Sequence, residues 1–142
     1  MLKFNSFIEK RRYFNQRQVV YIFKSKNGMS KVGVTSNIRS RISQIRSGSG
    51  FEIEKMACSL PMLPQEARAI ESIILNHFSS KKGIGEWLKI KYDLLFKYAD
   101  SKTTMIGYDV SWLKSLGEFE FEEILEDFIR NNYWQMDKVV KT

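Results

Sequence analysis

The sequence predicts an α+β domain, built as a small, mainly antiparallel three-stranded sheet flanked by helices, with a helical C-terminal extension. Two observations lead to this fold class. Runs of β-branched and aromatic residues alternate with helix-spaced apolar residues in the order strand, strand, helix, strand, helix. Of the 142 residues, 43% are hydrophobic and 27% are charged, which is the balance of a globular domain with a real core.

The first two strands form a predicted hairpin. Residues 18–24 (QVVYIFK) and 29–34 (MSKVGV) are rich in strand-forming residues, and the SKNG segment between them is a hairpin signal. A three-residue loop ending with Gly28 in the left-handed conformation would place Tyr21 and Lys31 on one face. A two-residue turn would place them on opposite faces, because pleat parity flips. The sequence permits both.

The remaining elements follow from apolar spacing and turn residues. They are a helix at 38–46, a strand at 51–60, a helix at 64–79 and an apolar segment returning to the core at 83–90. Ser36 or Asn37 is the expected N-cap of the first helix. Pro64 suits the first turn of the second helix. From residue 91 onward the pattern predicts helices.

Net charge divides the chain. Residues 1–90 carry +10 and residues 91–142 carry −3, which together give the +7 of the whole sequence. We therefore expect a basic N-terminal arm at 1–18, the main domain at 19–90 and a helical C-terminal lobe at 91–142. A basic body indicates a polyanionic partner such as a nucleic acid. The alternative interpretation is that the positive charge only serves solubility.

Composition also excludes several classes of protein. With Cys58 as the only cysteine and His77 as the only histidine, neither an internal disulfide nor a zinc finger is expected. No apolar stretch approaches the roughly 18 residues of a membrane span, and no signal peptide is visible. We expect a cytoplasmic protein without membrane contact. A thiol enzyme using Cys58 and His77 is one alternative.

Two charged residues stand out on the predicted helices. Glu71 falls inside the apolar arc of the helix at 64–79, where a carboxylate is costly to bury unless something pairs with it. Arg41 lies directly beside the isoleucine stripe of the helix at 38–46, while Arg39 and Arg46 flank its other side. The simpler interpretations are a structural ion pair for Glu71 and a snorkelling side chain for Arg41.

The sequence contains an ordered series of short motifs. The series is Val19-Val20-Tyr21, Lys31-Val32-Gly33, Arg41, Glu71 and Gly85-Glu86-Trp87. In order and spacing it resembles the GIY-YIG nuclease superfamily, and most closely the phage and mobile-element branch whose second motif reads Lys-Ile-Gly. Val19-Val20 stands where the superfamily has Gly-Ile, and Lys31 stands where it has the second tyrosine.

The resemblance implies a metal-dependent DNA endonuclease that hydrolyses phosphodiester bonds. Because each chain carries one set of these residues, we expect one strand to be nicked per protomer. By that comparison Glu71 would ligate Mg²⁺ or Mn²⁺, and Tyr21 would help deprotonate the attacking water. Arg41 would bind the scissile phosphate. Lys31 would assist by charge, near the phosphate or by keeping Tyr21 toward phenolate. A tyrosine has an ordinary pKa near ~10, so nearby cations would have to lower it to make a useful base.

Double-stranded DNA is the expected partner of a monomer or weak homodimer. The residues expected to contact DNA are Lys24, Lys26, Arg39, Arg46, Lys81 and Lys82. A DNA-binding regulator that no longer cuts is the main alternative, and a protein-interaction module acting through the acidic C-terminal segment is another. The set of Tyr21, Arg41 and Glu71 favours cutting, since pure binding does not need a carboxylate facing a polyanion.

Overall fold

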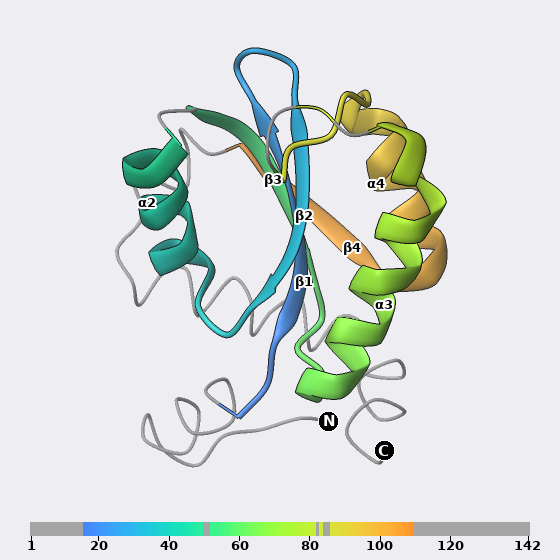
Figure 1. Ribbon diagram of the computed structural model, residues 1–142. Helices are drawn as coiled ribbons and strands as arrows, with labels where there is room; N and C mark the ends of the chain where they lie inside the picture. Colours follow the sequence, from blue (N-terminus) through green and yellow to red (C-terminus); the bar gives the residue numbers. More distant parts are fainter. Residues whose placement is uncertain (1–15, 50–51, 82, 84–85, 110–142) are drawn as a thin grey trace.

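A computed structural model of the chain describes residues 16–49, 52–81, 83 and 86–109, and confirms the α+β class (Figure 1). The elements in chain order are β1 (Val19–Ser25), β2 (Ser30–Thr35), α2 (Ile38–Ser49), β3 (Ile53–Ser59), α3 (Pro64–His77), the short 3-10 helix η1 (Ser79–Lys81), α4 (Tyr92–Lys102) and β4 (Met105–Asp109). All strand pairs are antiparallel. Within these residues no helix has the length and apolar character needed to cross a membrane.

The sheet has four strands in the order β2-β1-β3-β4, so the predicted three strands and the uninterrupted helices after residue 90 are corrected. Residues 105–109 pair with β3, with Met105 opposite Ser59. This pairing provides hydrogen-bond partners for the backbone N–H and C=O groups along the outer edge of β3. Because the two strands are far apart in sequence, local residue patterns do not predict their pairing. Residues 1–15 of the predicted arm and 110–142 of the predicted lobe lie outside the described residues.

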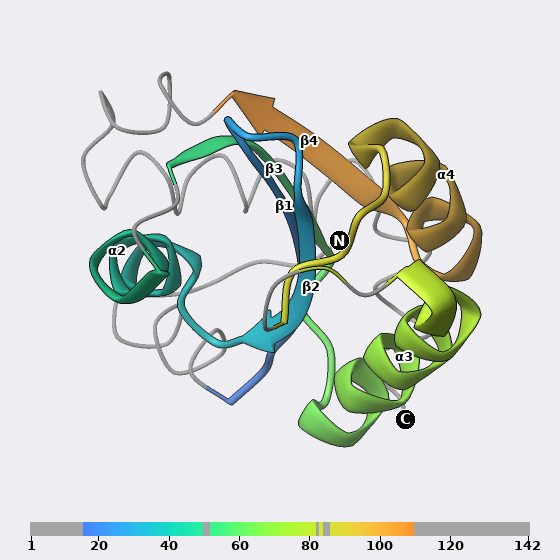
Figure 2. The same ribbon diagram turned by 45° about the horizontal axis from the view of Figure 1, so that its top comes forward.

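Helices cover both faces of the sheet, with α2 on one side and α3 and α4 on the other (Figures 1 and 2). Val19, Tyr21 and Phe23 pack in the cluster that includes α2, whereas Val20 and Ile22 pack in the cluster that includes α3 and α4. A central strand buried on both faces has no need of apolar/polar alternation. This explains the continuous apolar run of β1.

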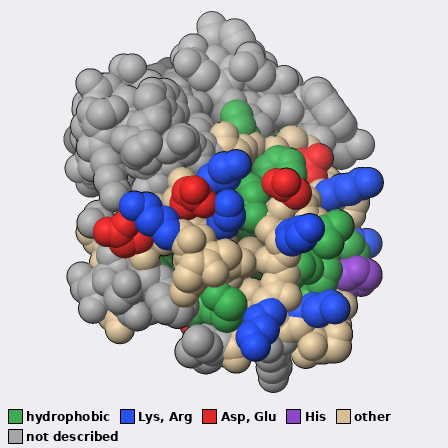
Figure 3. All heavy atoms as spheres, turned by 90° about the horizontal axis from the view of Figure 1, so that it is seen from above, with side chains coloured by type: hydrophobic (Ala, Val, Ile, Leu, Met, Phe, Trp, Pro, Cys, Tyr) green, Lys and Arg blue, Asp and Glu red, His purple; other side chains and the backbone are tan. Residues whose placement is uncertain are grey.

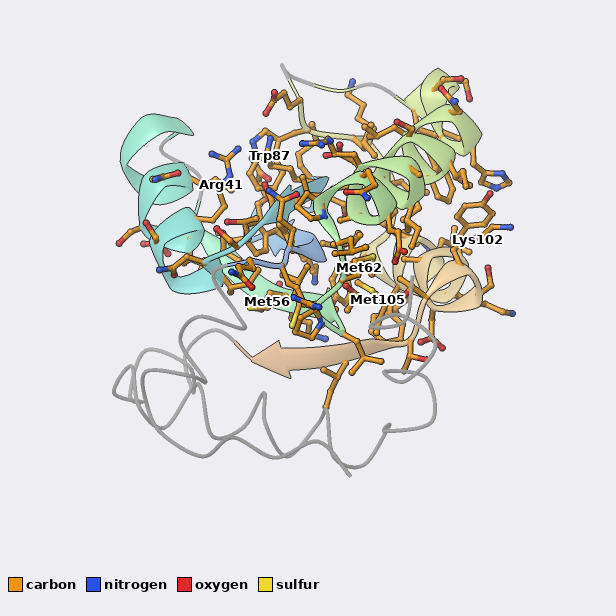
Figure 4. All side chains as sticks on the ribbon, turned by 90° about the horizontal axis from the view of Figure 1, so that it is seen from below. Arg41, Met56, Met62, Trp87, Lys102 and Met105 are labelled. Atoms are coloured by element: carbon orange, nitrogen blue, oxygen red, sulfur yellow. The ribbon has the colours of Figure 1, made fainter. Side chains whose placement is uncertain are left out.

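Methionine side chains contribute to the packing on both faces of the sheet (Figure 4). Met56 belongs to the cluster with α2, and Met62 and Met105 belong to the cluster with α3 and α4. Trp87 is buried in the first of these clusters. The apolar segment predicted at 83–90 therefore does return to the core.

The turn between β1 and β2 has three residues, which resolves the alternative that the sequence leaves open. The backbone N–H of Ser25 donates to the carbonyl of Met29 at 2.9 Å, and Gly28 has a φ of +87°. This is the left-handed conformation that the odd-length loop requires. The resulting register places Tyr21 and Lys31 on the same face of the hairpin.

Close packing at Gly33 fixes the position of the Tyr21 ring. Gly33 is the register partner of Tyr21, and a Cβ atom added at Gly33 would overlap the phenol ring. The ring is fully buried and stacks on Phe23 with 4.4 Å between centroids. Only glycine leaves room for the ring in this position.

We expect Gly33→Ala to destabilise the fold by about 1–3 kcal/mol, the usual cost of overpacking a buried site. The matched control is Gly107→Ala on β4, where an added Cβ meets its nearest neighbour at an ordinary 3.6 Å. Denaturant unfolding of both variants measures the difference. Equal stability of the two variants would contradict the packing argument.

Candidate active site

A cavity of about 490 Å³ lies at β2, the edge strand of the sheet. Its lining residues are Tyr21, Lys31, Val32, Gly33, Val34, Arg41, Glu71, Leu75, Asn76, Ser79, Glu86 and Leu88. The structure thus brings together all four residues for which the sequence predicted a catalytic role. They come from β1, β2, α2 and α3.

The cavity takes side chains from both faces of the sheet. Tyr21 belongs to the face covered by α2, and Glu71 comes from α3, which covers the opposite face. A site shared between two faces is open only at an edge strand, where no further strand separates them. β2 is that strand, and its alternating residues line the cavity from both sides.

Arg41 is held against Tyr21 by α2. The side-chain oxygen of Asn37 accepts a hydrogen bond from the backbone of Ser40 at 3.0 Å, which makes Asn37 the N-cap, one of the two residues expected there. One turn later, the Arg41 Nε donates to the Tyr21 hydroxyl at 2.9 Å. Its Nη1 donates to the Gln44 side chain at 3.2 Å, a contact that sequence reasoning missed.

Tyr21 is a phenol whose pKa is raised. Burial is the largest cause, and the negative charges of Glu71 and Glu86 add to it. The hydrogen bond and the positive charge from Arg41 act in the opposite direction but do not outweigh burial. Arg41 thus favours the phenolate form, but the pKa of Tyr21 stays above its ordinary value because burial has the larger effect.

The ammonium of Lys31 forms an ion pair with the carboxylate of Glu86. The Lys31 side chain is only 6% exposed, whereas that of Glu86 is 79% exposed. The hydrogen bond from Lys31 lowers the pKa of Glu86. Sequence reasoning named Glu86 only as part of a motif. The buried Trp87 beside it is the signal that could have placed Glu86 at this cavity, because the anchored indole fixes the neighbouring backbone.

Glu71 is half-buried, and within the described part of the chain its carboxylate has neither a hydrogen bond nor an ion pair. Burial raises its pKa, the charge of Glu86 raises it further, and the charge of Lys31 lowers it. Among the described residues no group of three or more His, Cys, Asp and Glu side chains could hold a metal ion. Mg²⁺ often binds through one or two carboxylates with waters and substrate phosphates, so a single unpartnered Glu71 fits that ion.

Two of the lysines predicted to contact DNA lie on the β1–β2 hairpin and form ion pairs with acidic residues near or on β3. Lys24 pairs with Glu54 at 2.8 Å, and Lys26 pairs with Glu52 at 2.7 Å. Figure 3 looks at the end of the molecule that carries the hairpin turn, and it shows acidic side chains beside several basic ones. DNA contact by these two lysines stays a prediction.

Lys81 is exposed on η1, close to the cavity-lining residue Ser79. Its carbonyl accepts a 2.6 Å hydrogen bond from the backbone of Lys89, which is also exposed and which the sequence analysis did not select. The two lysines therefore stand together near the cavity. The side chains of Arg39 and Arg46 and the whole of Lys82 lie outside what the structure describes.

The thiol-enzyme alternative is wrong. Cys58 is fully buried in the cluster with α2, and burial raises the pKa of its thiol to about 12. His77 lies on α3, on the other side of the sheet, where it stacks on Tyr98 with 3.8 Å between ring centroids. A nucleophilic cysteine needs a lowered pKa and an accessible thiolate, and Cys58 has neither.

Sheet, helices and cavity define a small α+β domain with an ionisable site at its edge strand. The T5orf172 domain model matches residues 18–101, more than half of the chain, and the protein belongs to that family. This is a phage-associated, nuclease-like domain, which indicates a phage-type nuclease or DNA-binding function. The more specific assignment to the GIY-YIG superfamily stays a prediction. No curated protein and no solved structure matches the chain.

We expect Cys58 to resist thiol reagents in the folded protein. A rise in pKa from 9.0 to about 12 lowers the thiolate fraction about a thousandfold at pH 8, and burial blocks access as well. Colorimetric thiol titration at pH 8, with and without denaturant, measures this. Rapid modification of the native protein would contradict the described packing of β3.

Proposed function

We propose that this protein is a metal-dependent DNA endonuclease that hydrolyses phosphodiester bonds. The observation that carries the proposal is the convergence of Tyr21, Arg41 and Glu71, with Lys31, on one cavity. These side chains supply a proton acceptor, two cations and a free carboxylate, which are the groups that phosphodiester hydrolysis requires. Membership of a nuclease-like family supports the same class of function.

Arg41 would bind the scissile phosphate. Two of its nitrogens already donate, to Tyr21 and to Gln44, and these bonds hold the guanidinium in a defined orientation. Its remaining N–H groups would donate to non-bridging phosphate oxygens. Charge grows on those oxygens as water attacks phosphorus, so a fixed guanidinium would stabilise the transition state more than the ground state.

Tyr21 would take the proton of the attacking water. In the hydrolysis one P–O bond forms to the water oxygen, the P–O bond to a sugar oxygen breaks, and the leaving oxygen is protonated by solvent. The phenolate required for this is the minor form at neutral pH, because the pKa of Tyr21 is raised. Arg41 is the neighbour that favours phenolate, by hydrogen bond and by charge.

Glu71 would hold Mg²⁺ or Mn²⁺. Bound there, such an ion would supply Lewis-acid activation of the phosphate and orientation of the nucleophile. The Glu71 carboxylate fits this role because it lines the cavity and is unpartnered within the described residues. Its raised pKa means that protonation, and with it loss of metal affinity, would begin at a higher pH than for an ordinary glutamate.

We expect Glu71→Gln to abolish cleavage while DNA binding persists or tightens. Loss of the metal-holding carboxylate removes several kcal/mol of transition-state stabilisation, so the rate should fall by about two orders of magnitude or more. Supercoiled plasmid incubated with Mg²⁺, Mn²⁺ or EDTA measures the activity. Glu66→Gln, the same change on the same helix outside the cavity, is the matched control.

Undiminished cleavage by Glu71→Gln would overturn the assignment of the site. Tight DNA binding by the wild type without cleavage in either metal would instead place the protein among DNA-binding regulators that do not cut. That second function is compatible with membership of the family, which indicates a nuclease or a DNA-binding function.

We expect the cleavage rate to rise with pH from neutral to alkaline conditions, with a slope of log rate against pH of about one. The reason is that phenolate grows tenfold per pH unit below the raised pKa of Tyr21. Tyr21→Phe keeps the ring and should remove the slope as well as most of the rate. A slope unchanged in Tyr21→Phe would show that another group accepts the proton.

We expect a single protomer to nick. One set of Tyr21, Arg41 and Glu71 addresses one phosphodiester at a time, and the antiparallel strands of a duplex cannot meet one fixed site in the same pose. A double-strand cut would need a second protomer related by two-fold symmetry. Plasmid assays read beside sedimentation with DNA test this. Linear product from a stable dimer without a nicked intermediate would contradict it.

A further inference from the structure

Lys31 and Glu86 differ sharply in how tightly the structure holds them. The Lys31 side chain is 6% exposed on β2, and that of Glu86 is 79% exposed after η1. A buried ammonium needs an anion beside it, whereas an exposed carboxylate regains water when it leaves. The partner that can move at low cost is therefore Glu86, and the charge that must always be compensated is that of Lys31.

The pair stands inside the cavity where the proposed function places the DNA phosphate. Among the residues that the structure describes, four charged side chains line this cavity: the cations Lys31 and Arg41, and the carboxylates Glu71 and Glu86. Their formal charges cancel, whereas the sequence of residues 1–90 as a whole carries +10. With Glu86 in place, an entering phosphodiester would give the cavity an excess negative charge. With Glu86 turned out to solvent, the phosphate takes its place and the balance is restored.

We propose that Glu86 is a displaceable counter-ion, which neutralises Lys31 until a DNA phosphate replaces it. Glu86 is then a positioning residue: it keeps the Lys31 ammonium extended toward the cavity, and it opposes every anion other than one able to bind Lys31 and Arg41 together. This inference rests on the proposed function, since it takes the arriving anion to be a DNA phosphodiester.

The test is DNA binding by fluorescence anisotropy with a labelled duplex in EDTA, where hydrolysis does not interfere. Glu86→Gln should bind about five- to tenfold more tightly than the wild type, because no carboxylate competes for Lys31. Glu54→Gln is the control, since it frees a lysine outside the cavity by the same change of charge. Its gain should be smaller than that of Glu86→Gln.

Salt dependence gives a second readout. In the wild type the phosphate replaces one anion on Lys31 while the freed Glu86 gathers a cation, so this contact releases no net counter-ion. In Glu86→Gln the same contact releases one, and the slope of log affinity against log salt should steepen by about 0.9. An unchanged slope would overturn the exchange.

A double-mutant cycle shows whether the gain acts through Lys31. In a Lys31→Met background, Glu86→Gln should change affinity less than about twofold. A gain that persists there, or that equals the gain of Glu54→Gln, would overturn the proposal. Thermal melts confirm folding. If Glu86→Gln does not fold, Glu86→Asp retains the charge with a shorter reach and should give a smaller gain that also depends on Lys31.

The outcomes also separate this proposal from the proposed function. If Glu86→Gln gains DNA affinity through Lys31 but the wild type never cuts plasmid, the counter-ion proposal stands and the endonuclease proposal is overturned. If the wild type cuts plasmid but Glu86→Gln gains no DNA affinity, the endonuclease proposal stands and the counter-ion proposal is overturned.

Discussion

The register of the β1–β2 hairpin is the constraint on which the candidate site depends. Three loop residues, with Gly28 at positive φ, set the pairing so that Tyr21 lies over Gly33 and shares a face with Lys31. A two-residue turn would instead place Tyr21 and Lys31 on opposite faces of the hairpin, because pleat parity flips. Lys31 would then no longer share the face on which Arg41 donates to Tyr21. Gly33 is equally necessary, because only a residue without a side chain leaves room for the Tyr21 ring.

Charge is arranged around this backbone frame so that few groups are left uncompensated. Arg41 donates to Tyr21, and the buried Lys31 is neutralised by Glu86. Glu71 is the exception among the described cavity residues, since its half-buried carboxylate has no direct partner and its pKa is raised. A half-buried carboxylate without a direct partner, close to the negative charge of Glu86, costs stability, and such a cost is typical of positions shaped by ligand binding rather than by folding.

Sequence patterns predicted local features well and long-range pairings poorly. Apolar spacing placed Glu71 inside the apolar arc of one helix and Arg41 beside the apolar stripe of another, and both residues line the cavity. The hairpin parity stayed open, because the turn residues suit both loop lengths and only the packing of Tyr21 on Gly33 favours one. The apolar Trp87 could have placed Glu86 near the cavity, but its segment has no periodicity and did not show which residue it contacts. That residue is Lys31, fifty-five residues away in sequence. The sequence did not predict the ion pair of Lys24 with Glu54 or the strand β4 for the same reason, since both depend on residues distant in sequence.

The division of the cavity between two faces of the sheet has an evolutionary consequence. The Tyr21–Arg41 pair is built into the packing of β1, Gly33 and α2, whereas Glu71 projects from α3 and takes no part in either buried cluster. Under the proposed function, a change at the Glu71 codon alone would remove hydrolysis and leave the hairpin and the core intact. A single substitution would then convert a cutting enzyme into a protein that binds DNA without cutting it.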